Sequence, residues 1–76
     1  MPGSEQWHRQ YELAGGESHL VYYPRDPALT GWEILRIPVQ HRDARYAYEV
    51  RRNDKPVGKP HYQLRAAKAY VESTLK

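Results

Sequence analysis

The chain of 76 residues contains no cysteine, no phenylalanine and only one methionine. The absence of cysteine excludes disulfides and cysteine-based zinc sites. A domain of this size buries only about 60% of the surface of its unfolded chain, so its stability is marginal. Seven tyrosines and two tryptophans must therefore supply much of the core. A homodimer is one further way for such a chain to bury apolar surface.

Long apolar runs are also absent from the sequence, and we expect no membrane partner. Residues 1–5 lack the basic start and the apolar stretch of a signal peptide. We therefore expect a cytoplasmic protein that consists of a flexible tail at residues 1–5 and a single domain at residues 6–76. Arginine outnumbers lysine by eight to four, which suggests a bacterial or phage genome rich in GC.

The clearest pattern in the chain lies at residues 45–52, where Tyr46, Tyr48 and Val50 alternate with small or charged residues. A period of two is typical of a strand that turns one face toward the core. The intervening positions are expected to face water: Ala47, Glu49 and Arg51. An amphipathic segment at residues 64–76 predicts a helix. The sequence therefore predicts an α+β fold, a small antiparallel β-sheet of three to five strands packed against one C-terminal α-helix.

The C-terminal helix is expected to place one apolar stripe on the sheet, formed by Leu64, Ala67, Val71 and Leu75. Gln63 precedes the helix and is a poor N-cap residue. Glu72 and Lys76 have the i,i+4 spacing of a helical ion pair, but such a pair adds only a few tenths of a kcal/mol.

Residues 7–14 allow two readings. Their alternation favours a strand, which Gly15-Gly16 would connect to a second strand at residues 18–23. The alternative is a helix over the same residues, with Ser4 as its N-cap and Gly15 at its C-terminal end. We favour the hairpin because residues 18–23 are rich in β-forming residues and need a neighbouring strand.

A third strand is expected at residues 32–39, where Pro38 either ends the strand or confines it to an edge. Residues 57–62 predict a short edge strand limited by Pro60. Connectors rich in polar residues or proline are expected at three places: residues 24–30, 40–44 and 53–56.

No combination of residues predicts catalysis. The four histidines lack the spacing of a helical zinc motif, and no cysteine accompanies them. Ser18 and His19 are adjacent, but neighbours on a strand point to opposite faces, so they would not meet. A phosphate-binding loop needs glycines that open a helix, whereas Gly15-Gly16 precedes a strand. We therefore expect a protein that is not an enzyme and needs no metal or other cofactor.

The net charge of +3 is unevenly distributed along the chain. Residues 1–31 contain two basic and four acidic residues, whereas residues 32–76 contain ten basic and five acidic residues. A basic segment interleaved with aromatic residues is typical of a surface that contacts phosphates and unpaired bases. The predicted nucleic-acid contacts are Arg36, Arg42, Arg45, Arg51, Arg52, Lys55 and Lys59.

Residues 32–75 have a strand–strand–short strand–helix order that resembles the sheet-based DNA-binding modules at the N-termini of tyrosine recombinases. Three segments carry the resemblance: Tyr46–Arg52, Lys55–Gly58 and Ala66–Tyr70. Gln63 departs from it, because those modules usually place Ser or Thr before the helix. With the N-terminal hairpin, the order is similar to single-strand-binding coactivator and PUR-type folds. A helix at residues 7–14 would instead give the outline of a double-stranded-RNA module.

Two functions follow from these observations. The first is a small nucleic-acid-binding accessory protein that contacts DNA or RNA through a basic sheet surface and its hairpins. The second is a protein-interaction module, such as a phage-type inhibitor or a small subunit, that docks through a sheet edge or an aromatic patch. One continuous basic face would favour nucleic acid, and dispersed arginines beside an exposed apolar edge would favour a protein partner.

Overall fold

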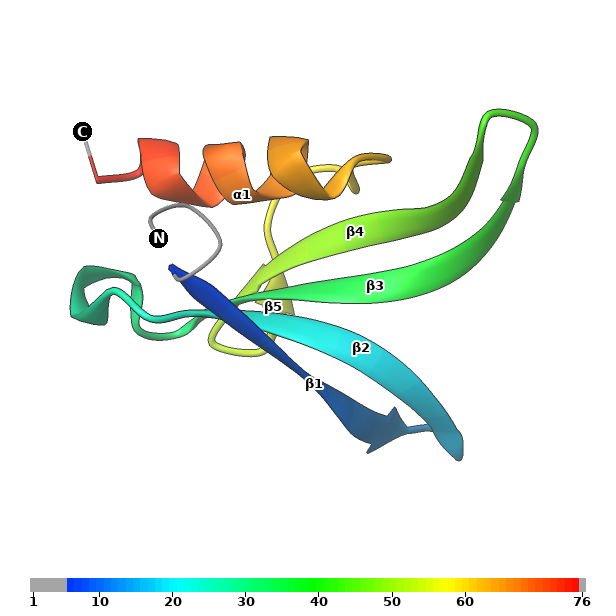
Figure 1. Cartoon of the computed structure of the whole chain (residues 1–76), viewed down its shortest axis with the longest axis horizontal. Helices are drawn as coiled ribbons and strands as arrows, with labels where there is room; N and C mark the ends of the chain where they lie inside the picture. Colours follow the sequence, from blue (N-terminus) through cyan, green and yellow to red (C-terminus); the bar gives the residue numbers. More distant parts are fainter. Residues whose placement is uncertain (1–5, 76) are drawn as a thin grey trace.

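The computed structural model describes residues 6–75, so the tail expected at residues 1–5 lies outside the described residues. Five antiparallel strands lie side by side in their sequence order, and one helix packs on the sheet (Figure 1). This arrangement confirms the predicted α+β class. The elements are β1 (Trp7–Ala14), β2 (Glu17–Pro24), a 3₁₀ turn (Pro27–Leu29), β3 (Trp32–His41), β4 (Ala44–Arg52), β5 (Lys55–Pro56) and α1 (Leu64–Ser73).

Residues 7–14 form a strand, as the preferred reading predicted. β1 and β2 pair without interruption from Trp7↔Pro24 to Ala14↔Glu17. Gly15 and Gly16 connect the two strands, with φ angles of 62° and 83°. Positive φ at both central residues matches the twist of a two-residue hairpin turn, and glycine adopts it without steric cost.

β3 is the central strand of the sheet, and it extends beyond Pro38 to His41. The prediction that this strand ends near Pro38 is therefore wrong. Arg36 pairs with Tyr48 and, two residues further along β3, Pro38 pairs with Tyr46. The Tyr48 amide points away from β3 and donates a hydrogen bond to the carbonyl of His61. In an antiparallel pair, two residues that face each other turn their N–H and C=O groups either both toward the other strand or both away from it, and residues two apart along a strand behave alike. Position 38 therefore points its backbone groups away from β4, and the missing N–H of Pro38 removes no hydrogen bond to β4.

The two hairpins diverge from each other (Figure 1). β2 and β3 pair only at Val21↔Leu35 and Tyr22↔Ile34, so the β1–β2 hairpin bends away from the β3–β4 hairpin toward their tips. Pairing between β4 and β5 is shorter still, at Arg51↔Pro56 and Arg52↔Lys55. The strand expected at residues 57–62 does not form: β5 precedes it, and only His61 makes a bridge, to Tyr48. Pro60 limits this edge because it has no N–H to donate.

The core lies between α1 and one face of the sheet. Both tryptophans enter it, together with the fully buried Ile34, Ala67 and Val71. Its remaining buried members are Leu20, Tyr22, Leu29 and Val50, with Tyr48, Val57 and Leu64 packed against them. The predicted stripe of α1 is confirmed at Ala67 and Val71, whereas Leu75 lies after the helix and is exposed.

Two finer predictions about exposure have different outcomes. Val50 and Tyr48 face the core as expected, whereas Ala47 is buried although it faces away from the helix. Ala47 is paired with Ile37 in the middle of the sheet, where its small side chain is shielded from water.

Gln63 makes no side-chain capping bond to α1. The predicted Glu72–Lys76 pair lies outside the described residues. In the part of the chain that the structure describes, no helix is long and apolar enough to cross a bilayer.

Candidate nucleic-acid interface

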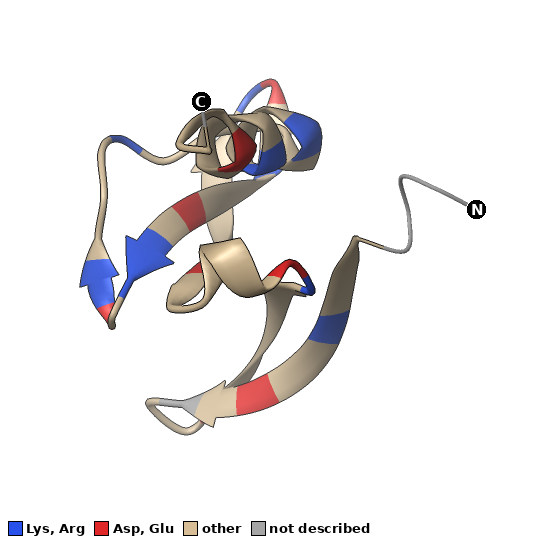
Figure 2. Cartoon of the chain, turned by 90° about the vertical axis from the view of Figure 1, so that its left-hand side faces the viewer, with Lys and Arg blue, Asp and Glu red and all other residues tan. Residues whose placement is uncertain are grey.

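The two faces of the sheet carry different charges. Strand register and alternation place four basic residues on the side that α1 covers: Arg9, Arg36, Arg52 and Lys55. Among the described strand residues, no aspartate or glutamate lies on that side. The opposite face carries Glu12, Glu17, Glu33 and Glu49 with Arg45 and Arg51. Figure 2 marks these charges on the ribbon.

A basic groove lies between the β1–β2 hairpin and the first half of α1. Its volume is about 500 Å³, and its cationic residues are Arg9, Arg25 and Lys68. The rest of the lining is Trp7, His8, Tyr22 and Leu64. Among the residues that the structure describes, no carboxylate lines this groove, so an anion placed there would meet positive charge from β1, from the loop after β2 and from the helix.

Lys68 lies over the aromatic floor of the groove. Its Nζ atom is 5.6 Å from the ring centroid of Tyr22 and 5.9 Å from that of Trp7. Both rings are buried, with 7% and 5% of their surface exposed, so they hold the ammonium group rather than stack on a base. The groove is therefore suited to phosphate contacts more than to base stacking.

The outer half of the sheet adds a second basic position on the same side. The guanidinium of Arg36 lies 4.1 Å above the ring of Tyr46. This pair borders a crevice of about 230 Å³ where the two hairpins separate. The crevice is also lined by Glu17, Ser18, His19, Leu20 and Pro38. The guanidinium edge stays available to an anion because stacking on an aromatic face engages only its plane.

The remaining predicted contacts lie at the two ends of β4. Arg42 and Arg45 are exposed at the β3–β4 turn, where Arg42 lies 3.8 Å from Asp43. Arg52 lies at the other end, 5.3 Å from the ring centroid of Trp32, with Lys55 opposite it in the register. Lys59 is exposed in the loop that leads to α1. The predicted set therefore does not form one continuous surface.

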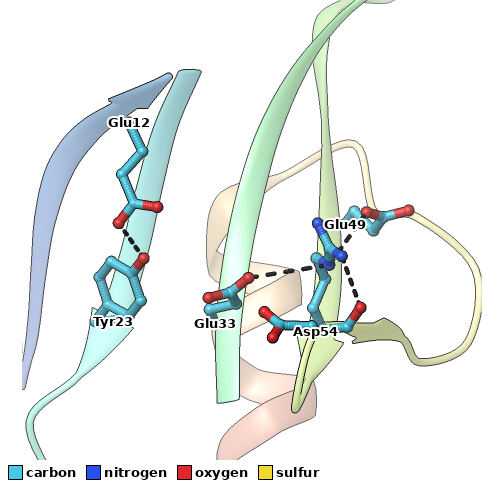
Figure 3. Close-up of polar contacts among 6 residues, drawn as sticks. Glu12, Tyr23, Glu33, Glu49 and Asp54 are labelled. Carbon is cyan, nitrogen blue, oxygen red and sulfur yellow. Dashed lines mark hydrogen bonds and ion pairs between the residues drawn. The ribbon is translucent and has the colours of Figure 1, made fainter. Parts of the chain in front are cut away.

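Arg51 lies on the opposite face of the sheet, beside the carboxylates of Glu33 and Glu49, which Figure 3 labels. Its Nε atom lies 3.9 Å from both Glu33 and Glu49, and its Nη2 donates a 2.7 Å hydrogen bond to the carbonyl of Asp54. Only 28% of its side chain is exposed. These contacts give Arg51 a role within the fold, so we leave it out of the interface proposed below.

Several ionisable groups on the face opposite the helix have shifted pKa values. Burial raises the pKa of Glu33, while nearby Arg51 lowers it and the charges of Asp54 and Glu12 raise it further. Tyr23 donates a short hydrogen bond to Glu12 (Figure 3), which lowers the pKa of the Glu12 carboxyl with help from Gln10. Burial raises the pKa of the Tyr23 hydroxyl, and the bond to Glu12 adds to this shift. The strands place four glutamates against two arginines on the face opposite the helix, which makes it the acidic face.

The histidines make local contacts on both sides of the sheet. His8 stacks on Tyr23 with 5.4 Å between ring centroids, and His41 stacks on Tyr62 at 4.7 Å. His61 packs beside Tyr70 and pairs with the backbone of Tyr48. Within residues 6–75, no group of three His, Cys, Asp or Glu side chains lies close enough to hold a metal ion.

No protein-family model, curated protein or solved structure matches this chain. The chain from residue 32 onward runs through β3, β4, β5 and α1, but the short strand is at residues 55–56, where a turn was predicted, and not at residues 57–62. The DNA-binding role that the resemblance implies stays a prediction.

Sequence reasoning missed three residues of the basic groove: Arg9, Arg25 and Lys68. Arg9 and Arg25 belong to the acidic part of the chain, so their segment gave no signal. The alternation of β1 alone places Arg9 on the face of Trp7, away from Glu12. Reading charge face by face, rather than segment by segment, would have found it.

Proposed function

We propose that this protein binds nucleic acid through the helix-covered side of the sheet. The observation that carries the proposal is the charge segregation, because the strands present basic residues and no acidic ones on that side. We define the helix-side basic surface by its members: Arg9, Arg25, Arg36, Arg52, Lys55 and Lys68.

The ligand that fits this surface is a phosphate backbone. The groove supplies three cations and no carboxylate from the described residues, and Arg36 and Arg52 add positive charge on the same side of the sheet. Trp7 and Tyr22 are too deeply buried to stack on bases. Recognition by phosphate contacts gives strong salt dependence and little sequence preference. Two exposed residues offer further contacts: Arg42 at the β3–β4 turn and Lys59 in the loop that leads to α1.

A fluorescence anisotropy titration against labelled single-stranded DNA, duplex DNA and duplex RNA tests the proposal. We expect affinity to fall at least tenfold between about 50 mM and about 200 mM salt. The variant Arg9→Gln should weaken binding and reduce the slope of log K against log salt by about one.

Arg51→Gln is the matched control, because it removes the same charge from the opposite face of the sheet. It should leave the salt slope unchanged under conditions where circular dichroism shows that both variants are folded. Equal effects of the two substitutions would mean that only net charge matters and would contradict the proposed surface. Absence of binding to all three ligands at low salt would contradict the function itself.

A protein partner is the second candidate, and two observations favour it: the seven basic residues predicted from the sequence do not form one continuous surface, and β1 exposes an apolar edge. Tyr11 and Leu13 are 67% and 82% exposed on β1, at an edge of the sheet. Exposed apolar side chains beside unpaired backbone groups are typical of strand-addition interfaces. If the titrations show no binding, a pull-down with the folded protein becomes the deciding experiment.

A further inference from the structure

The two edges of the sheet differ in how they meet solvent. The β5 edge is short and protected, because β5 has two residues and Pro56, Lys59 and Pro60 lie along it. β1 forms the other edge over eight residues, in unbroken register with β2 and without proline or lysine. An edge strand of this length without blocking features is a template for a further strand.

The backbone groups that β1 turns outward can be identified. The carbonyl of Gln6 accepts a 2.8 Å bond from the Arg25 amide, so even-numbered residues of β1 bond toward β2. Ala14 and Glu17 flank the two-residue turn and bond to each other, and Ala14 is also an even-numbered residue. Backbone orientation alternates along a strand. The amides and carbonyls that point away from the sheet therefore belong to Trp7, Arg9, Tyr11 and Leu13.

We propose that two copies of this chain associate by pairing their β1 strands antiparallel, with the twofold axis at Gln10. This register joins all four outward residues in reciprocal pairs, namely Trp7 with Leu13 and Arg9 with Tyr11, each twice. A twofold axis at Arg9 or at Tyr11 would also place the helix-side faces of the two strands on one side of the sheet. It would form only three hydrogen-bonded pairs among the residues of β1. The ladder is longest with the axis at Gln10.

The side chains are complementary in the same register. On the helix side, the guanidinium of Arg9 lies opposite the ring of Tyr11 from the second copy, a cation–π arrangement. Leu13 lies opposite Trp7, so the most exposed apolar side chain of β1 gains an apolar neighbour. On the other face, His8 lies opposite Glu12 and Gln10 lies opposite its own copy. Self-complementary charge is what favours a second copy over an unrelated partner.

The proposed pairing has a structural consequence. Directly opposite residues in an antiparallel pair point to the same face, so both α1 helices would cover the same side of one continuous sheet. Both basic grooves would then open on that side. The association is argued from β1 alone and does not depend on whether the grooves bind nucleic acid.

Cysteine substitution tests the register directly, because the chain has no cysteine of its own and any disulfide must join two copies. In a pair without ladder hydrogen bonds the two Cα atoms lie about 4.5 Å apart, within the range for a disulfide. Gln10→Cys should therefore form a covalent dimer on mild oxidation, faster than Arg9→Cys or Tyr11→Cys. Lys59→Cys, exposed on a loop away from β1, measures random collision. Equal rates at Gln10 and Lys59 would overturn the proposal.

Sedimentation equilibrium of the unmodified chain supplies the second readout, and we expect a concentration-dependent monomer–dimer equilibrium. Leu13→Lys should weaken it by about tenfold or more, because edge lysines oppose strand addition. Tyr11→Pro removes an outward N–H without touching the β1–β2 ladder and should abolish dimers while circular dichroism remains that of the folded sheet. A monomer at every soluble concentration would overturn the proposal whatever the result of the nucleic-acid titrations.

Discussion

Trp7 and Glu72 join the first strand to the last turns of the helix. The indole Nε1 donates a 3.0 Å hydrogen bond to Oε2 of Glu72 across 65 residues of sequence. Only 5% of Trp7 is exposed, so water cannot easily replace this acceptor. We expect Glu72→Ala to lower the free energy of unfolding by about 1–3 kcal/mol, because a buried N–H would be left without a partner. Urea unfolding followed by tryptophan fluorescence measures this loss.

Glu72→Gln is the control for that prediction, since its side-chain carbonyl still accepts the bond from Trp7. It should retain most of the stability that Glu72→Ala loses. Equal losses in both variants would show that the charge of Glu72, and not the hydrogen bond, is what the fold requires.

Gly31 touches the turn between β4 and β5. The Asn53 amide donates a 2.9 Å bond to the Gly31 carbonyl, and a Cβ at Gly31 would lie 2.8 Å from Oδ1 of Asn53. Its φ angle of 98° is also unfavourable for other residues. We expect Gly31→Ala to destabilise the fold by about 1–2 kcal/mol in urea unfolding, through its backbone conformation, because the exposed Asn53 side chain can turn away from the added Cβ.

Gly16→Ala separates the two causes, because Gly16 has a φ of 83° but nothing within 4 Å of the added Cβ. It should lose only the backbone contribution, about 1–2 kcal/mol. We expect the two losses to be similar, and a clearly larger loss for Gly31→Ala would show that the Asn53 side chain cannot move away from the added Cβ.

The strands and the helix were predictable because they rest on local periodicity. Residues 45–52 alternate strictly, and the Ala67 and Val71 spacing places both on the buried stripe of α1. The extension of β3 beyond Pro38 was not predictable, because it depends on which way one amide position points relative to β4. That orientation is a property of the strand pairing and has no signal in the residue itself.

The candidate surface was only partly predictable, for a similar reason. Arg36, Arg52 and Lys55 lie on the helix side of the sheet, but the prediction did not separate them from Arg45 and Arg51 on the other face. Arg9 and Lys68 come from opposite ends of the chain and line one groove only because Lys68 of α1 lies over Trp7 of β1 and Tyr22 of β2. Whether they bind a ligand stays a prediction, but their proximity could not be read from sequence.

Arg51 is expected to support the fold through its carboxylate neighbours. Its Nε atom lies 3.9 Å from Glu33, a carboxyl whose pKa burial already raises. Arg51→Met should therefore lower stability at neutral pH by about 1 kcal/mol, since Glu33 loses its compensating charge and Asp54 loses a donor to its carbonyl. The double variant Arg51→Met/Glu33→Gln should recover part of this loss in urea unfolding. No recovery would show that Glu33 does not need Arg51.

The Tyr23–Glu12 bond predicts how stability changes in acid. The hydrogen bond from Tyr23 lowers the pKa of Glu12 in the folded chain, so it favours the carboxylate over the protonated form. This contribution is present above the pKa of the unfolded chain and is lost as the pH falls through the lower folded value. Tyr23→Phe should therefore reduce stability clearly at pH 7 and much less near pH 3. Urea unfolding at both pH values, with the exposed Tyr11→Phe as control, measures the difference. A stability deficit that stays constant with pH would mean that Tyr23 acts through packing against His8 and not through the carboxylate of Glu12.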